Sequence, residues 1–376
     1  MKTNQKIFRN NAWVSIGEQP SLKNPLVFIF GNRFLLETKD IHNEVKQLYP
    51  DGHLIFGTSS GEIVDSEVSE ESISITAIEF EKTTFQIKTH NIKESNYNSR
   101  DAGKSLVSQF NLEGLKHIFV VSEGSNVNGS QLTNGMRKAL QTDILITGCL
   151  CGDDGRFKKT MASYNESPKE GEIIAIGFYG ETFESSFSIY GGWNPFGPKR
   201  VVTKSKDNIL YELDGKPALA LYKKYLGEKQ NELPKSALIY PLNVTSKKNK
   251  QAYVRTILNI DEENEAMVLA GDIPEDSKVQ LMMASMDDLV RASEKAAINA
   301  LEKRSKKPQL ALLVSCIGRK LVLNQRVEEE VEEVREVLGE NVTLTGLYSY
   351  GEIAPFRGER SCKLHNQTMT ITLISE

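Results

Sequence analysis

The chain has 376 residues, of which 39% are hydrophobic and 26% charged, and its formal net charge is −4. This composition is that of an ordinary globular protein long enough for about two or three domains. The acidic balance opposes nucleic-acid binding, which needs a basic face. No apolar run approaches the roughly 20 residues that span a bilayer, and no signal peptide is recognisable. Four cysteines are too few for a disulfide framework, so we expect a cytoplasmic protein without membrane insertion.

A pattern of strand, helix, strand, loop and strand first occurs near the N-terminus. Its parts are a buried strand at 26–30, a helix beginning at Asp40, a strand at 54–56, a loop at 57–63 and a strand at 72–80. The helix has apolar residues at helical spacing, and the strands are apolar runs of strand length. We therefore predict one compact unit here, preceded by an extension over residues 1–24.

The same order of elements occurs twice more. The second copy has 117–121, a helix capped by Ser130, 144–147, a loop at 148–155 and 172–179. The third copy has 310–314, a helix over 326–339, 342–345, a loop at 346–356 and 368–374. Such self-similarity along a chain is the signature of an internal repeat.

The loops of the three copies align with one another. They run from Gly57 to Glu62, from 148 to 153 and from 346 to 352, and each reaches an acidic residue directly after a second glycine. A helical crossover implies parallel strands, whereas a short loop to the closing strand implies antiparallel pairing. We therefore predict a mixed α/β fold, in which the repeated units form mixed sheets flanked by helices.

Residues 181–309 interrupt the repeat. A Gly- and Pro-rich turn at 191–200 holds Trp193, and strands are predicted at 237–240, 252–260, 265–270 and 278–284. Ser285 and Asp288 have the spacing of a capping box before a helix. The interruption predicts two domains, the first over residues 25–200 and the second over 201–376.

The sequence lacks the motifs of several common binding sites and catalytic sites. Neither GxGxxG nor GxxxxGK[ST] occurs, which opposes the common nucleotide-binding folds. Cys149 and Cys151 lack zinc-site spacing. Cys316 or Cys362 with His365 leaves open a cysteine-dependent hydrolase or transferase, although no nucleophile-elbow motif is present. Buried, unreactive cysteine is the simpler alternative.

The third repeat carries most of the candidate binding residues. Arg319 follows a buried strand, where parallel sheets place ligand-binding loops, and an arginine there suits a carboxylate or phosphate. The alternative is a structural pair with Glu328 or Glu329. His365 is the histidine within the polar cluster, so it is the candidate axial ligand if haem is bound, and otherwise it hydrogen-bonds within its loop. The predicted ligand-binding residues are Asp153, Trp193, Cys316, Arg319, Tyr348, Tyr350, Glu352, His365, Asn366 and Gln367.

Several unusual strings carry a resemblance to a known family. They include GCLCGDD, GGWNPFGPKRVVTKS, LYELDGKPALALY, VRTILNID, LLVSCIGRKLVL and GLYSYGEIAPF. With them the chain resembles the FIST family across about residues 25–376, covering its N- and C-terminal domains. Cys149 and Cys151 depart from the small residues usual in the family at that loop.

The resemblance implies a sensory module without catalytic residues of its own. FIST proteins bind small ligands, with amino acids proposed among them, and act on histidine kinases of two-component systems or on cyclic-di-GMP enzymes. A stand-alone subgroup is described as haem-binding sensors of nitric oxide, which leaves haem open as a cofactor here. The resemblance therefore predicts a small-molecule ligand and a separate signalling partner.

Overall fold

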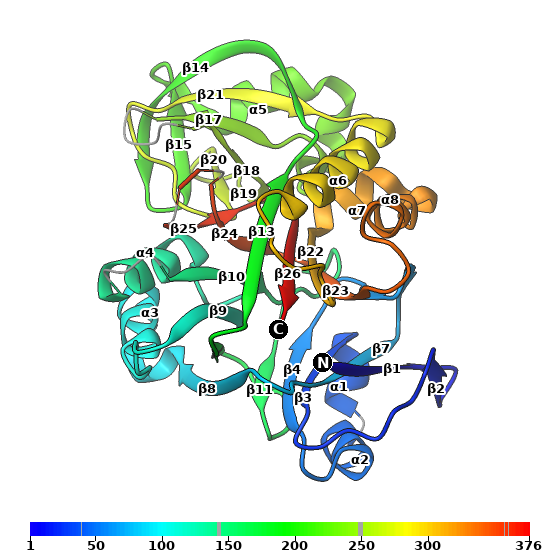
Figure 1. The fold of residues 1–376 in the computed structure, drawn as a ribbon. Coiled ribbons are helices and arrows are strands. Elements are labelled where there is room, and N and C mark those ends of the chain that lie inside the picture. The colour runs from blue at the N-terminus through cyan, green and yellow to red at the C-terminus, as the bar shows by residue number, and fades with distance from the viewer. Residues whose placement is uncertain (39, 141–143, 247–250, 357, 360) are drawn as a thin grey trace.

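The computed structural model describes the whole chain except residues 39, 141–143, 247–250, 357 and 360. It is a mixed α/β structure with three six-stranded sheets and one eight-stranded sheet (Figure 1). This confirms the predicted fold class of repeated units whose mixed sheets are flanked by helices. Among the described residues, no helix is long and apolar enough to cross a membrane.

The first repeat forms the first sheet. Its elements are β3 (Leu26–Gly31), α1 (Arg33–Thr38), α2 (Ile41–Leu48), β4 (His53–Thr58) and β7 (Ile73–Glu79). As predicted, β3 pairs in parallel with β4. The closing strand β7 is antiparallel, but it pairs with β3 and does not form the predicted hairpin with β4. The extension before residue 26, for which the sequence predicted no element, forms a hairpin of β1 (Lys2–Arg9) and β2 (Ala12–Ile16) that adds to β7.

The second repeat builds the second sheet with the same pairing. Its elements are β9 (Leu115–Ser122), α4 (Gly129–Leu140), β10 (Leu145–Leu150) and β12 (Glu172–Tyr179). The strand β8 (Thr84–Asn91) extends this sheet, and α3 (Ser99–Val107) packs beside α4. Here β10 is parallel to β9, and β12 is antiparallel to it.

The third repeat builds the third sheet. Its elements are β22 (Leu310–Cys316), α7 (Ile317–Leu323), α8 (Glu329–Leu338), β23 (Thr343–Ser349) and β26 (Met369–Ser375). The strand β22 pairs in parallel with β23 and antiparallel with β26. The long predicted helix is shorter than expected at its N-terminal end, where a separate turn of 3-10 helix precedes it, and it ends at Gly339 as predicted.

The three units exchange short strands in a cycle. After its loop, the first repeat contributes β5 (Glu62–Val64) to β23 of the third sheet. The third contributes β24 (Gly351–Pro355) to β10 of the second, and the second contributes β11 (Ala162–Tyr164) to β4 of the first. The inner faces of all three sheets thereby enclose one apolar core, which contains Phe28, Phe119 and Leu312.

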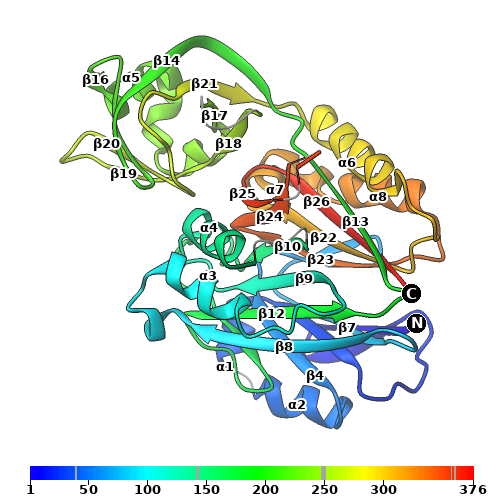
Figure 2. The same cartoon turned by 60° about the vertical axis from the view of Figure 1, so that its left-hand side comes forward.

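The interruption of the repeat forms a separate sheet. After β13 (Glu184–Tyr190), which borders the third sheet, the chain continues into β14 (Asn194–Lys206). Figure 2 shows this sheet standing beside α4 and β25 (Cys362–His365). Its other elements are β15 (Ile209–Leu213), β16 (Lys216–Pro217), α5 (Ala218–Leu226), β17 (Leu242–Thr245), β18 (Tyr253–Arg255), β19 (Ile257–Asp261), β20 (Ala266–Leu269) and β21 (Lys278–Met283).

Of two predictions made for this segment, one is wrong and one is confirmed. The predicted strand at 237–240 is wrong, because residues Lys235–Ile239 form a turn of 3-10 helix after Pro234. The predicted capping box is present, since Ser285 accepts from the Asp288 backbone amide and begins α6 (Met286–Leu301). α6 then covers the third sheet beside α8.

Candidate functional site

The aligned repeat loops meet through a cycle of backbone hydrogen bonds. The amide of Ser60 donates to Tyr348 (2.8 Å), that of Gly152 to Thr58 (3.0 Å) and that of Tyr350 to Leu150 (3.1 Å). Each loop is thereby fixed to a strand of another repeat. The meeting place is packed, and its polar groups are satisfied largely within the protein.

The acidic residues that end the three loops are all buried. Asp153 accepts from Arg33 (2.9 Å) and Arg156 (2.8 Å). Glu352 accepts from the Thr368 hydroxyl (2.8 Å), and burial raises the pKa of this carboxyl to about 8. Burial likewise raises the pKa of Glu62 to about 8. These carboxyls therefore tie the loops to the scaffold.

Arg319 lies in the interior, and its guanidinium donates hydrogen bonds to several groups of the same chain. Its Nη2 is 2.6 Å from Oε2 of Glu330, and both side chains have no exposed surface. The guanidinium also donates to the carbonyl oxygens of Gly191 (2.6 Å) and Leu289 (2.9 Å). Tyr348 donates to the same Glu330 carboxylate (2.5 Å). The arginine is thus paired with α8, one residue beyond the partners considered from the sequence.

The amides and rings of the predicted cluster also bind one another. Trp193 donates its indole N–H to the carbonyl of Gln367 (2.9 Å). The hydroxyl of Tyr350 donates to the Asp154 carbonyl (2.9 Å), and its ring stacks on Phe157 with 4.4 Å between centroids. Asn366 donates weakly to the Tyr350 carbonyl (3.4 Å). The structure brings these residues together as buried connections between units, and ligand binding by them stays a prediction.

The surroundings of His365 do not fit an axial haem ligand. Its ring is 3% exposed, its Nε2 donates to the Ala354 carbonyl (3.0 Å), and the ring of Phe356 packs edge-on against it. Burial lowers the pKa of His365 to about 3. A porphyrin needs an open face at the ligating nitrogen, whereas Nε2 of this buried side chain is already bonded to the Ala354 carbonyl. Among them, no group of three or more acidic, cysteine or histidine side chains could hold a metal ion.

The cysteines do not have the environment of nucleophiles. All four are buried. Burial raises the pKa of the Cys316 thiol well above its usual value and that of Cys362 to about 12. A nucleophilic cysteine needs a lowered thiol pKa. Cys149 and Cys151 face the core between the sheets, where a small apolar side chain suffices.

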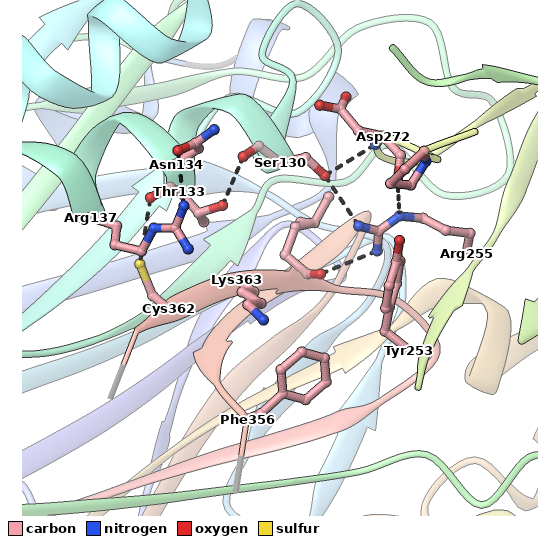
Figure 3. Close-up of a pocket in the computed structure, with 12 residues that line it drawn as sticks. Ser130, Thr133, Asn134, Arg137, Tyr253, Arg255, Asp272, Phe356, Cys362 and Lys363 are labelled. Carbon is pink, nitrogen blue, oxygen red and sulfur yellow. Dashed lines mark hydrogen bonds between the residues drawn. The ribbon is translucent and has the colours of Figure 1, made fainter. Parts of the chain in front are cut away.

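A cavity of about 200 Å³ lies where three parts of the chain meet. Helix α4 forms one wall, β25 with its preceding loop forms the second, and the separate sheet forms the third (Figure 3). The lining residues are Ser130, Thr133, Asn134, Arg137, Tyr253, Arg255, Asp272, Pro274, Phe356, Cys362, Lys363 and Leu364. Such a position between structural units is typical of small-ligand sites.

Arg255 is the most unusual residue of this cavity. It ends the short strand β18 and is 6% exposed. Its guanidinium donates to the carbonyl oxygens of Asp272 (3.1 Å), Val254 (3.2 Å) and Leu364 (3.2 Å), and to the hydroxyl of Ser130 (3.3 Å). All four acceptors are uncharged. Within the part of the chain that the structure describes, no carboxylate forms an ion pair with Arg255.

The charge on Arg255 is therefore only partly compensated. Burial lowers the pKa of Arg255, but a guanidinium stays protonated in proteins. It has five N–H donors, and the acceptors among the described residues take four of them, which leaves one N–H of Nη2. The face of Tyr253 lies 4.4 Å from the guanidinium carbon and adds a cation–π contact. Burying a cation without an anionic partner is costly, so this arrangement suits an anion in the cavity.

Two further cations line the cavity with different surroundings. Arg137 is exposed, and its Nη2 donates to the Asn134 side chain (3.2 Å) without an ion pair to any described carboxylate. Lys363 forms an ion pair with Glu359 (3.3 Å) and lies 4.6 Å from the centre of the Phe356 ring. The cavity is thus cationic at two guanidiniums and partly neutralised at the lysine.

The prediction of the site from sequence missed this cavity. Arg255, Arg137 and Asp272 are distant in the chain and belong to no repeat loop. A signal was present in the string YVRTIL, where a lone arginine stands inside an apolar strand pattern. A charge in such a position is rarely buried without a reason.

The comparisons with known proteins identify a family over most of the chain. Residues 25–216 match the model of the FIST N domain, and residues 218–355 match that of the FIST C domain. The uncharacterised protein MJ1623 of Methanocaldococcus jannaschii is 28% identical over 212 residues, which are 51% of this chain and 39% of that protein. A crystal structure of chorismatase matches with a TM-score of 0.33 and 9% identity, covering 99% of this chain and 98% of the other.

Proposed function

This chain belongs to the FIST family, whose domains are sensory signal-transduction domains that bind small ligands, and on this premise we propose that it senses a small anion. The ligand binds in the cavity beside Arg255, and the signal passes to a separate protein. That partner is a histidine kinase or a cyclic-di-GMP enzyme, and the protein acts in the cytoplasm.

The buried guanidinium of Arg255 carries this proposal. It lines a cavity, retains an N–H donor and forms no ion pair with a described carboxylate, so the more distant Asp272 carboxylate offsets its charge only in part. Arg319, from which the sequence predicted the anion contact, is instead neutralised by Glu330. An anion in the cavity would neutralise the charge of Arg255. A charge-assisted hydrogen bond of this kind contributes about 1.5–3 kcal/mol to binding.

The position of the cavity supplies a route for the signal. Ser130 of α4 accepts from Arg255 and from the amide of Asp272 (3.1 Å), so few direct bonds join the separate sheet to the second repeat here. Asn128 adds one more bond, to the Asp272 carboxylate (2.9 Å). A ligand contacting all three walls would favour one arrangement of these parts over others. The partner protein would bind differently to the surface of the ligand-bound arrangement and to that of the ligand-free arrangement.

Binding is tested by thermal unfolding of the purified chain with a panel of small carboxylates and phosphates. We expect at least one anion to raise the Tm of the wild type and to have no effect on Arg255→Gln. Lys138→Gln is the matched control, because Lys138 is an exposed neighbour on α4 outside the cavity. If every anion raises the Tm of the wild type and Arg255→Gln equally, the cavity is not the sensing site.

The effect on a signalling partner is tested separately with purified histidine kinases from the same organism. We expect the autophosphorylation rate of at least one of them to change on adding the protein, and to change again on adding the anion found in the panel. An unchanged rate of every kinase in both steps would contradict a kinase as the partner, and the same design then applies to cyclic-di-GMP synthesis.

A further inference from the structure

Two arginines that form no ion pair with a carboxylate of the described residues line the same cavity, one at each side. Figure 3 shows Arg255 and Arg137 on opposite sides of the lining residues, with Lys363 between them and Cys362 beside Arg137. We infer that the ligand is a short α,ω-dicarboxylate, with one anionic group for each arginine and an apolar body between them. This inference rests on the proposed function and specifies the ligand of that site.

The inner group is defined by Arg255. The bonds to Leu364 and Ser130 fix the orientation of the guanidinium. They therefore also fix where an acceptor for the remaining Nη2 N–H must lie. With one N–H left, this guanidinium can donate a single charge-assisted hydrogen bond to a carboxylate oxygen. The surrounding walls are closed, since this guanidinium belongs to a side chain that is 6% exposed.

The outer group is defined by Arg137. It lies one helical turn after Thr133, and both residues line the cavity, so this face of α4 is turned toward it. The neutral Asn134 side chain is its acceptor among the described residues. An exposed arginine at the mouth suits the second anionic group, which stays partly in water.

Part of the cavity lining is apolar. Phe356, Leu364 and Pro274 contribute to it, and the Lys363 ammonium, which lies between the two arginines, is already paired with Glu359. A hydrocarbon chain between two carboxylates would cover these surfaces without burying a polar group.

The same surroundings disfavour an added ammonium group. Asp272 is the acidic residue among the described lining residues, and its Oδ1 accepts from Asn128 (2.9 Å). Its carboxylate points away from Phe356 and Lys363 in Figure 3. An ammonium beside Arg137 would therefore meet like charge, whereas beside Arg255 the Asp272 carboxylate would offset only part of the repulsion.

The test is calorimetric titration of the wild type with succinate, glutarate, adipate and pimelate. Each diacid is compared with the straight-chain monoacid of equal length, and adipate also with α-aminoadipate. We expect the best diacid to bind roughly tenfold or more tightly than its monoacid, because one charge-assisted contact corresponds to about that factor. We expect the added ammonium to weaken binding.

The variant Arg137→Gln separates this inference from the proposed function. It should reduce the affinity for the diacid to that for the monoacid and leave the monoacid unchanged, whereas Lys138→Gln should preserve the preference. Equal binding of diacid and monoacid, both lost in Arg255→Gln, would overturn the dicarboxylate and leave the anion sensor standing. Tighter binding of α-aminoadipate, or no binding by the whole series, would also overturn it, while the broader panel still decides the proposed function.

Discussion

The guanidinium of Arg319 and the carboxylate of Glu330 form an ion pair of 2.6 Å in the interior, and neither side chain is exposed. Four elements meet around this pair, because Arg319 belongs to α7 and Glu330 to α8, while Ser293 of α6 and Tyr348 of β23 donate to the same carboxylate (3.1 and 2.5 Å). The pair therefore joins helices α6, α7 and α8 to the third sheet.

Arg319→Met is expected to lower the free energy of unfolding by about 3–5 kcal/mol, because it leaves Glu330 buried without its cation. Urea unfolding measures this loss, and Arg319→Met with Glu330→Leu should recover part of it. Ligand affinity of the folded fraction should stay at the wild-type value. A variant that is as stable as the wild type but binds no ligand would restore Arg319 as a binding residue.

Glu352→Gln should alter how stability depends on pH. In the folded chain burial raises the pKa of Glu352 to about 8, above the value near 4.5 of an unperturbed glutamate. Between these values the unfolded chain has released this proton and the native chain retains it, so this group's contribution falls as pH rises. The change in the free energy of unfolding is on the order of 5 kcal/mol across that window.

Glutamine mimics the protonated carboxyl, so Glu352→Gln should gain stability relative to the wild type from pH 5 to pH 8. Chemical unfolding at several pH values measures the difference. Glu81→Gln is a suitable control, since that side chain is half-exposed. A difference between variant and wild type that is constant with pH would show that Glu352 is ionised in the native state.

Gly346→Ala should be strongly destabilising. A Cβ at this position would lie 1.8 Å from the carbonyl oxygen of Leu313, which is its partner in the parallel pair of β22 and β23. The strands cannot separate without losing the ladder between them, so we expect a loss of several kcal/mol, of the order of 4. Thermal unfolding measures it.

Gly155→Ala is the matched control for that substitution. Its Cβ would meet no atom within 4 Å, and the residue is exposed. We expect a change within about 0.5 kcal/mol. Equal effects of the two substitutions would contradict the close approach of β22 and β23.

The thiols should react slowly in the native protein. All four cysteines are buried, and burial raises the pKa of Cys362, which lines the cavity, to about 12. Because the thiolate is the reactive form, we expect Ellman's reagent to label the native chain far more slowly than the chain in denaturant. Rapid labelling of Cys362 would revive the cysteine-dependent hydrolase or transferase as an alternative.

The repeated fold was readable from local patterns. Apolar runs of strand length, amphipathic helices and the glycines of the three loops recur in one order, and each feature depends on neighbours in the chain. The N-terminal hairpin was missed because its strands are polar and half-exposed, so no apolar alternation marks them. The turn at Lys235–Ile239 was mistaken for a strand because a short apolar run does not distinguish the two.

The candidate site depended on contacts that local patterns do not carry. Sequence reasoning favoured Arg319 over Arg255, although both arginines follow or end a buried strand. The two arginines differ in their neighbours. Glu330 of α8 forms an ion pair with Arg319, whereas Arg255 is surrounded by neutral carbonyl groups.

By itself, the sequence determined the family, the α/β class and the threefold repetition, because those depend on residue order and on periodicity within each element. The tertiary structure alone decided the cyclic exchange of β5, β11 and β24, and it decided which cations are neutralised. The physical reason is that strand pairing and charge compensation act between atoms in space. Residues 137, 255 and 363 become neighbours only when the separate sheet, α4 and β25 have packed together.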